Sequence, residues 1–375
     1  MVPISGTCDK RFSRVREIFE NNFVNGSDVG ASVALMLDGE LVIDLWGGWK
    51  DVEKTQLWQE DTIVPVFSTS KTMAALCALI LVERGLLDPF APVAKYWPEF
   101  AANGKEKVEV RHLMSHTSGL SGWEQPVTVE TVYDWEAGMA HLAQQAPWWE
   151  PGTASGYHLV SYNHLVGGLV QMITGISPTE FFAQEISGPF GIDYSFGLTN
   201  DIAHRIAPMI PFETPLLDFS TIQPSSPIMK TFTGPNLIGS TTGEFLAYPY
   251  LMNGISNARG IAQSQAVVSH GGTLNGRKLL SSSTIDLIFE KQSDGNDLIL
   301  NFPISFGIGY ALSDEAWGMK TGSRACWWDG IGGSRIVNFV DKNATFGYAM
   351  NKMSSMAGDP RSNDMIKAVQ DVLEA

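Results

Sequence analysis

The sequence Val66-Phe67-Ser68-Thr69-Ser70-Lys71 is followed at once by an apolar run over residues 73–82. The run has helical length, and its uniform apolarity predicts a helix buried at the centre of the fold. Ser68 then lies in the first turn, and Lys71 lies beside it at the i,i+3 spacing of a helix face. Because a serine hydroxyl is a weak nucleophile that needs a neighbouring base, the two residues are a candidate catalytic couple. Amides at the start of the helix would favour a developing oxyanion there.

The S-x-x-K spacing alone is weak evidence, because a chain of this size contains about one match by chance. A serine that caps a helix and a lysine that faces water would give the same pattern. Two observations favour catalysis. No second S-x-x-K occurs in the chain, and this one opens its most apolar segment.

Composition excludes several classes of function. The chain has 375 residues, 44% of them hydrophobic, which is enough for a large core. Its net charge of −15 argues against nucleic acid or an anionic membrane as a partner. No apolar run is long enough to span a bilayer, and the first residues do not resemble a secretory signal. The three cysteines (Cys8, Cys77 and Cys326) follow no pattern, which predicts reduced thiols and a cytoplasmic location.

Strand signals lie near both ends of the chain. Segments 31–37 and 40–46 flank Asp38-Gly39, the dipeptide that a type I′ hairpin turn prefers. Further strands are expected over 334–340 and 345–351, ahead of a helix over 363–374. The two ends are therefore expected to share one antiparallel sheet.

The middle of the chain is interrupted by prolines and has helical patterning between them. We expect an α/β domain built from residues 1–67 and about 245–375, and a mostly helical domain over about 68–244. Within the latter, residues 205–240 are rich in Pro, Ser and Thr, which predicts an irregular loop of the kind that lines a site.

Two further segments carry candidate site residues. Tyr157 follows a Pro-Gly-Thr turn (151–153) and precedes an apolar segment of helical length. Near the C-terminus, Trp328-Asp329-Gly330 is followed by glycines and a predicted strand, and glycine lets backbone approach a ligand closely.

Together with Ser68 and Lys71, these segments resemble the serine β-lactamase and penicillin-binding superfamily in order and approximate spacing. Residues 112–120 (HLMSHTSGL) are similar to another run of that superfamily. The resemblance covers about residues 30–350 and implies an α+β, β-lactamase/transpeptidase-like fold. That fold has an antiparallel sheet flanked by helices, and a mostly helical domain.

Two departures narrow the resemblance. The second motif of class C β-lactamases is Y-x-N, but Leu159 stands in the place of the asparagine. Their third motif begins with a cation, as in K-T-G, or with histidine, whereas Trp328 begins it here. The combination is similar to the family VIII carboxylesterases, which carry W-x-G, and to polyketide acyltransferases of the same fold.

The resemblance implies a serine carboxylesterase that acts without metal or organic cofactor on a small-molecule ester or thioester. Ser68 would form the acyl-enzyme, with a neutral Lys71 and a Tyr157 phenol acidified by that lysine sharing the proton. The backbone amides of Ser68 and Ile331 would form the oxyanion hole. Substrate-binding residues would be Trp328, as a wall of the site, and Gly330. The position of Trp149 is compatible with the acyl pocket and equally with a cap on the helical domain, and we take it as a third substrate-binding candidate.

The histidines of the chain allow two other interpretations. His112 and His116 are spaced like a metal pair, but no third ligand stands at usable spacing, so a structural role is favoured. A Ser68–His158–Asp329 triad is disfavoured because His158 is next to Tyr157 and would point elsewhere.

Four functions are compatible with the sequence. Ester hydrolysis is preferred. The alternative is a same-fold acyltransferase that moves an acyl group from a thioester or ester to an alcohol in secondary metabolism. A β-lactamase or D-alanyl peptidase, and a non-catalytic binding module, are disfavoured by the missing cation and by the intact serine, lysine and tyrosine. The G-x-S-x-G elbow of α/β-hydrolases is absent. Residue types do not fix the acyl chain, the stereochemistry or the oligomeric state.

Overall fold

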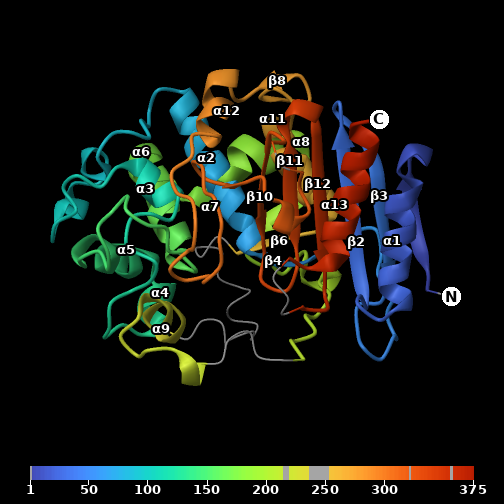
Figure 1. Cartoon of the computed structure of the whole chain (residues 1–375), viewed down its shortest axis with the longest axis horizontal. Helices are drawn as coiled ribbons and strands as arrows, with labels where there is room; N and C mark the ends of the chain where they lie inside the picture. Colours follow the sequence, from blue (N-terminus) through green and yellow to red (C-terminus); the bar gives the residue numbers. More distant parts are fainter. Residues whose placement is uncertain (1, 214–218, 236–252, 321, 355–357) are drawn as a thin grey trace.

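The computed structural model describes residues 2–213, 219–235, 253–320, 322–354 and 358–375. One antiparallel sheet of seven strands runs in the order β1-β3-β2-β12-β11-β10-β9. Its strands come from both ends of the chain, as the sequence predicted (Figure 1). They are β1 (Ile4–Cys8), β2 (Gly30–Leu37), β3 (Glu40–Gly48), β9 (Ala311–Leu312), β10 (Ala325–Asp329), β11 (Arg335–Phe339) and β12 (Ala344–Met350).

The predicted hairpin joins β2 to β3. Asp38 and Gly39 both have positive φ angles, of 51° and 86°, as a type I′ turn requires. Strand β12 pairs with β2 over its whole length, from Ala344 opposite Leu37 to Met350 opposite Ala31. This pairing joins the two ends of the chain into one sheet.

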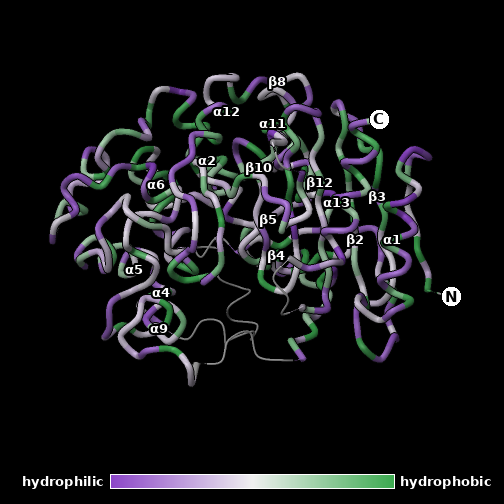
Figure 2. Tube along the Cα trace, in the orientation of Figure 1, coloured by the Kyte–Doolittle hydropathy of each residue, from purple (hydrophilic) through white to green (hydrophobic). Residues whose placement is uncertain are grey.

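Helices cover both faces of the sheet. A Cβ on Gly347 would lie 2.5 Å from the Ala258 carbonyl oxygen, so this residue of β12 faces α11 (Ala258–Ser269). The next residue, Tyr348, points the other way, toward Arg361 of α13 (Pro360–Leu373), because successive strand residues alternate. Helix α13 packs with α1 (Ser13–Val24). Figure 2 shows hydrophilic and hydrophobic residues alternating along α1, as expected for a helix with one face on the core.

Helix α2 (Lys71–Glu83) is the predicted central helix, and every residue from Lys71 to Leu81 is buried. Within the described residues, no helix is both long and apolar enough to cross a membrane. The other α-helices of the described residues are α3 (Val110–Met114), α4 (Val129–Tyr133), α5 (Trp135–Gln144), α6 (Gly168–Thr174), α7 (Pro178–Phe182), α8 (Gly188–Phe190), α9 (Pro227–Thr233) and α12 (Ser282–Ile288).

A second sheet leads the chain into α2. It has the order β4-β6-β5, with β4 (Val64–Phe67) ending directly before Ser68. Its other strands are β5 (Tyr194–Phe196) and β6 (Gly254–Ser256), and a short hairpin pairs β7 (Thr273–Leu274) with β8 (Arg277–Lys278). The predicted domain boundaries stay a prediction. Of the expected loop 205–240, the described part contains α9, and residues 214–218 and 236–240 lie outside the described residues.

Candidate active site

The candidate nucleophile lies at the junction of β4 and α2. Phe67, the last residue of β4, has φ 46° and ψ −127°, a conformation that residues other than glycine rarely adopt. The chain then makes one 3₁₀ turn over Ser68–Ser70 before α2 begins. Ser334, which follows the motif Trp328-Asp329-Gly330, supports this turn. Its Oγ donates to the Val66 carbonyl oxygen at 2.7 Å and lies 3.0 Å from Thr69 Oγ1. A sharp, supported turn therefore presents half-buried Ser68.

Lys71 is within hydrogen-bond distance of Ser68. Its Nζ lies 3.0 Å from Ser68 Oγ and donates to the Leu159 carbonyl oxygen at 2.8 Å. A backbone carbonyl of Leu159 thus contacts the lysine at the position where the Y-x-N motif has its asparagine. Burial lowers the pKa of Lys71 to about 7, because water cannot solvate its charged form. A large share of the amine is then neutral at neutral pH and can accept the Ser68 proton.

Tyr157 completes the cluster but is not acidified. Its ring centroid lies 4.9 Å from Lys71 Nζ, and its hydroxyl is hydrogen-bonded to the Ser68 side chain. Burial raises the pKa of Tyr157, and this outweighs the hydrogen bonds from Ser68 and Trp328 that lower it. The expectation that Lys71 acidifies this phenol is therefore wrong. The physical reason is that burial disfavours the charged phenolate, so Tyr157 stays protonated.

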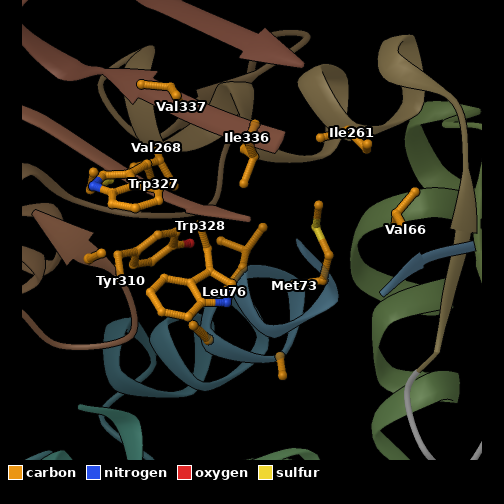
Figure 3. Packing of buried hydrophobic residues seen from close by; sticks show 14 of the residues in the cluster. Val66, Met73, Leu76, Ile261, Val268, Tyr310, Trp327, Trp328, Ile336 and Val337 are labelled. Carbon is orange, nitrogen blue, oxygen red and sulfur yellow. The ribbon is translucent and has the colours of Figure 1, made fainter. Parts of the chain in front are cut away.

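Trp328 lies on β10 and reaches the same cluster. Its Nε1 donates to Tyr157 Oη at 3.2 Å, and the two rings lie 5.0 Å apart between centroids. Figure 3 shows the Trp328 indole beside Leu76 of α2. Because an indole N–H can only donate, the Tyr157 oxygen accepts from it and keeps its own proton for another partner. The predicted wall residue thus also takes part in the hydrogen bonding of the site.

The residues after Trp328 form a tight turn. Gly330 donates to the Ser334 carbonyl oxygen at 2.8 Å, and Gly333 donates to the Gly330 carbonyl oxygen at 3.0 Å. A Cβ on Gly330 would lie 2.3 Å from the Val66 carbonyl oxygen, so only glycine fits against the nucleophile turn. The turn is thereby packed against β4. The roles of the Ile331 amide as an oxyanion donor and of Gly330 in binding substrate stay predictions.

The segment before Tyr157 is supported by Trp149. The indole Nε1 donates to the Ala154 carbonyl oxygen at 3.0 Å, and a Cβ on Gly156 would lie 2.3 Å from the same ring. Trp149 therefore packs under the chain that leads to Tyr157. Its predicted contact with substrate stays a prediction.

Comparison with known proteins places this geometry in a family. The family model described as Beta-lactamase matches residues 19–371. The chain belongs to the beta-lactamase family. The predicted α+β fold of the β-lactamase/transpeptidase type and the serine hydrolase class are both confirmed.

Three relatives illustrate the match. Esterase/beta-lactamase LipL of Mycobacterium tuberculosis is 31% identical over 326 residues, which are 82% of this chain and 74% of LipL. The crystal structure of a family VIII carboxylesterase superposes with a TM-score of 0.90 and 34% identity, covering 99% of this chain and 100% of the other. A penicillin-binding protein homologue from Caulobacter crescentus gives a TM-score of 0.90, 32% identity and the same coverage.

Within this beta-lactamase family fold, two residues that sequence analysis did not place at the site fix the backbone of Tyr157. The His116 carbonyl oxygen accepts from the Gly156 amide at 2.9 Å, and His116 Nδ1 accepts from the His158 amide at 3.0 Å. Between them, the Tyr157 amide donates to Asp297 Oδ1 at 3.0 Å. His116 thus has the structural role that was favoured over metal binding. The similarity of the run HLMSHTSGL to the superfamily was the only feature of the sequence that pointed to His116. No feature of the sequence pointed to Asp297.

The histidine triad is not assembled. Both ring nitrogens of His158 are occupied, with Nε2 lying 2.6 Å from Ser118 Oγ and Nδ1 2.8 Å from the Gly156 carbonyl oxygen. Asp329 Oδ1 instead lies 3.0 Å from Arg335 Nε, although the angle is outside hydrogen-bond geometry. Burial lowers the pKa of His158 to about 3, so this ring is neutral at neutral pH. Lys71, and not His158, is therefore the candidate base for Ser68.

Proposed function

We propose that the protein hydrolyses carboxylic esters of small molecules through an acyl-enzyme on Ser68. The observation that carries this proposal is the buried Lys71 amine, 3.0 Å from Ser68 Oγ and with its pKa lowered to about 7. A base of that pKa suits proton transfer near neutral pH. The relatives that are named esterase or carboxylesterase, at 31% and 34% identity, support the same substrate class.

In the first step, Ser68 Oγ bonds to the ester carbonyl carbon while its proton passes to Lys71 Nζ. The carbonyl oxygen becomes an oxyanion, for which the Ser68 and Ile331 amides are the candidate donors. Tyr157, still protonated, gives its proton to the departing alkoxide and is reprotonated from Lys71. Water then attacks the acyl carbon and gives a proton to Lys71. The bond between the acyl carbon and Ser68 Oγ breaks, and Lys71 returns the proton to Ser68 Oγ as the acid departs.

The third motif supports an ester over a β-lactam. Trp328 is uncharged, so it offers no cation to a substrate carboxylate, and Leu159 has no amide side chain for a β-lactam side chain. The net charge of −15 further supports a small molecule over nucleic acid or an anionic membrane surface. Free thiols at Cys8, Cys77 and Cys326 support a cytoplasmic location.

The direct test is turnover of p-nitrophenyl butyrate with and without an added short alcohol, with products identified by mass. Release of butyric acid in both conditions supports the hydrolase. Conversion of most of the acyl group to the ester of the added alcohol would instead favour the same-fold acyltransferase. Absence of p-nitrophenol release, together with no butyryl adduct on the intact protein, would contradict both.

The pH dependence of kcat/KM should follow Lys71. Only its neutral form accepts the Ser68 proton, so we expect kcat/KM to fall about tenfold per pH unit below about pH 7 and to level off above it. His116 and His158 cannot produce this limb, because burial lowers the pKa of both well below it.

Asp329 is the competing titrating group, since burial raises its pKa to about 7 as well. The Asp329→Asn variant separates the two. If Lys71 is the base, the acid limb of this variant stays near pH 7. Loss of the limb in Asp329→Asn would assign it to the carboxylate and contradict the lysine as base.

A further inference from the structure

Ser70, the third residue of the Ser68–Lys71 turn, makes contacts that the acyl-transfer steps do not use. Its side chain is only 1% exposed. Its Oγ donates to the Phe67 carbonyl oxygen at 2.5 Å and accepts from the Gly254 amide of β6 at 2.9 Å. The hydroxyl therefore links the peptide that precedes the nucleophile to the neighbouring strand.

The Phe67 carbonyl and the Ser68 amide belong to the same peptide plane. In a trans peptide the C=O and N–H bonds point in opposite directions, so fixing the carbonyl oxygen also fixes the direction of the Ser68 N–H. That N–H is the first candidate donor to the oxyanion. A hydrogen bond from Ser70 to Phe67 thus orients a group that the side chain of Ser70 never touches.

The orientation needs to be held, because Phe67 is strained. Its φ of 46° with ψ of −127° lies outside the regions that side-chain-bearing residues prefer. Rotation of the Phe67–Ser68 peptide changes the ψ of Phe67, so it can bring this residue toward the more favourable left-handed helical region, and it would turn the Ser68 N–H away from the substrate carbonyl. Ser70 opposes that rotation, since it would break the bond to the Phe67 oxygen.

The surroundings of Ser70 are shaped for this contact. A Cβ on Gly254 would lie 2.5 Å from Ser70 Oγ and 2.0 Å from Tyr194 Oη, so only glycine lets the strand approach the hydroxyl. The Gly254 amide in turn occupies an acceptor site of the hydroxyl, which leaves its proton for Phe67. The Tyr194 side chain also contacts the Ser70 hydroxyl, and all three contacts are thereby specified by the fold.

We propose that Ser70 is a positioning residue that aims the Ser68 amide at the oxyanion, acting through the Phe67–Ser68 peptide. This inference rests on the proposed acyl-enzyme on Ser68. A positioning role differs in its effects from a role in stabilising the turn alone. A misaligned amide weakens binding of the transition state more than binding of the ester, so kcat falls while KM changes little.

The test compares Ser70→Ala with wild type on p-nitrophenyl butyrate and on a 1,1,1-trifluoro-2-alkanone. Such a ketone adds Ser68 Oγ to its carbonyl carbon and leaves its oxygen as an oxyanion at the same donors. Loss of a whole oxyanion donor costs about 10²- to 10³-fold in rate, so we expect a partial loss of about 10- to 100-fold in kcat. The affinity for the ketone should fall by a similar factor, with KM little changed.

A matched control is Thr72→Val, which also removes one buried hydroxyl from the start of the same helix. Thr72 Oγ1 donates to the Thr69 carbonyl oxygen at 2.7 Å and does not contact the Phe67 peptide. Its kcat and ketone affinity should stay near wild type. Ser70→Cys, with a weaker donor of similar size, should fall between Ser70→Ala and wild type, and it serves if Ser70→Ala does not fold.

Wild-type kcat and ketone affinity in Ser70→Ala would overturn the inference, as would a lower melting temperature without any loss of ketone affinity. Failure of the proposed function has a different signature. In that case either the wild type releases no p-nitrophenol and forms no acyl adduct, or Ser68→Ala keeps esterase activity, whatever Ser70→Ala does.

Discussion

Replacing Ser68 by alanine is expected to lower kcat/KM for p-nitrophenyl butyrate on the order of 10⁶-fold, to a level close to background. The variant has no oxygen that can form the acyl-enzyme, and loss of a catalytic serine elsewhere has effects of this size. Ser68 is half-buried and Lys71 Nζ keeps its bond to the Leu159 carbonyl oxygen, so the fold should persist. The measurement is initial rate together with the intact mass after treatment with a fluorophosphonate.

The control for Ser68→Ala is Ser118→Ala. Ser118 Oγ lies 2.6 Å from His158 Nε2, so a second serine contacts a possible base next to Tyr157. Both residues are fully buried, so the probe should not reach Ser118. Wild type and Ser118→Ala should therefore gain one fluorophosphonate adduct, and Ser68→Ala none. Labelling that survives in Ser68→Ala and disappears in Ser118→Ala would make the histidine couple the nucleophilic site.

The sequence was sufficient for features that depend on neighbouring residues. The Asp38-Gly39 hairpin follows from turn chemistry, and the buried helix after Ser68 follows from continuous apolarity. Ser68 and Lys71 are three residues apart, so helical geometry alone brings their side chains together. The shared sheet was predictable because strand patterns occur at both ends of the chain and edge-to-edge pairing satisfies their backbone groups.

Individual contacts between side chains far apart in the chain were out of reach. The hydrogen bond from Trp328 to Tyr157 joins residues of β10 and of the segment before α6, and no local pattern sets it. The expected acidic phenol was wrong because burial, a property of the whole fold, determines the pKa of Tyr157. The backbone amides of residues 156–158 donate three hydrogen bonds to His116 and Asp297, and these contacts are equally non-local.

The second large effect is expected from Lys71→Met. Methionine has a similar length and no basic nitrogen, so Ser68 keeps its position but loses the group that accepts its proton. General base catalysis contributes about 10²- to 10⁴-fold, and we expect a loss of about 10³-fold in kcat/KM. The residual rate should no longer show the acid limb near pH 7 and should instead rise with hydroxide concentration. A variant with wild-type activity, or with an unchanged limb, would exclude Lys71 as the base.

Stability provides an independent check on the same variant. The pKa of Lys71 is lowered from 10.5 to about 7 by burial, so between these values the unfolded chain binds a proton that the folded chain does not. Through this group, wild-type stability should fall as pH decreases from about 10.5 to about 7 and then stay level. Lys71→Met removes this contribution, so its melting temperature should exceed that of wild type most at about pH 7 and below. The same change should thus raise stability while it removes catalysis, because the cost of burying an amine at the site is what keeps that amine a base.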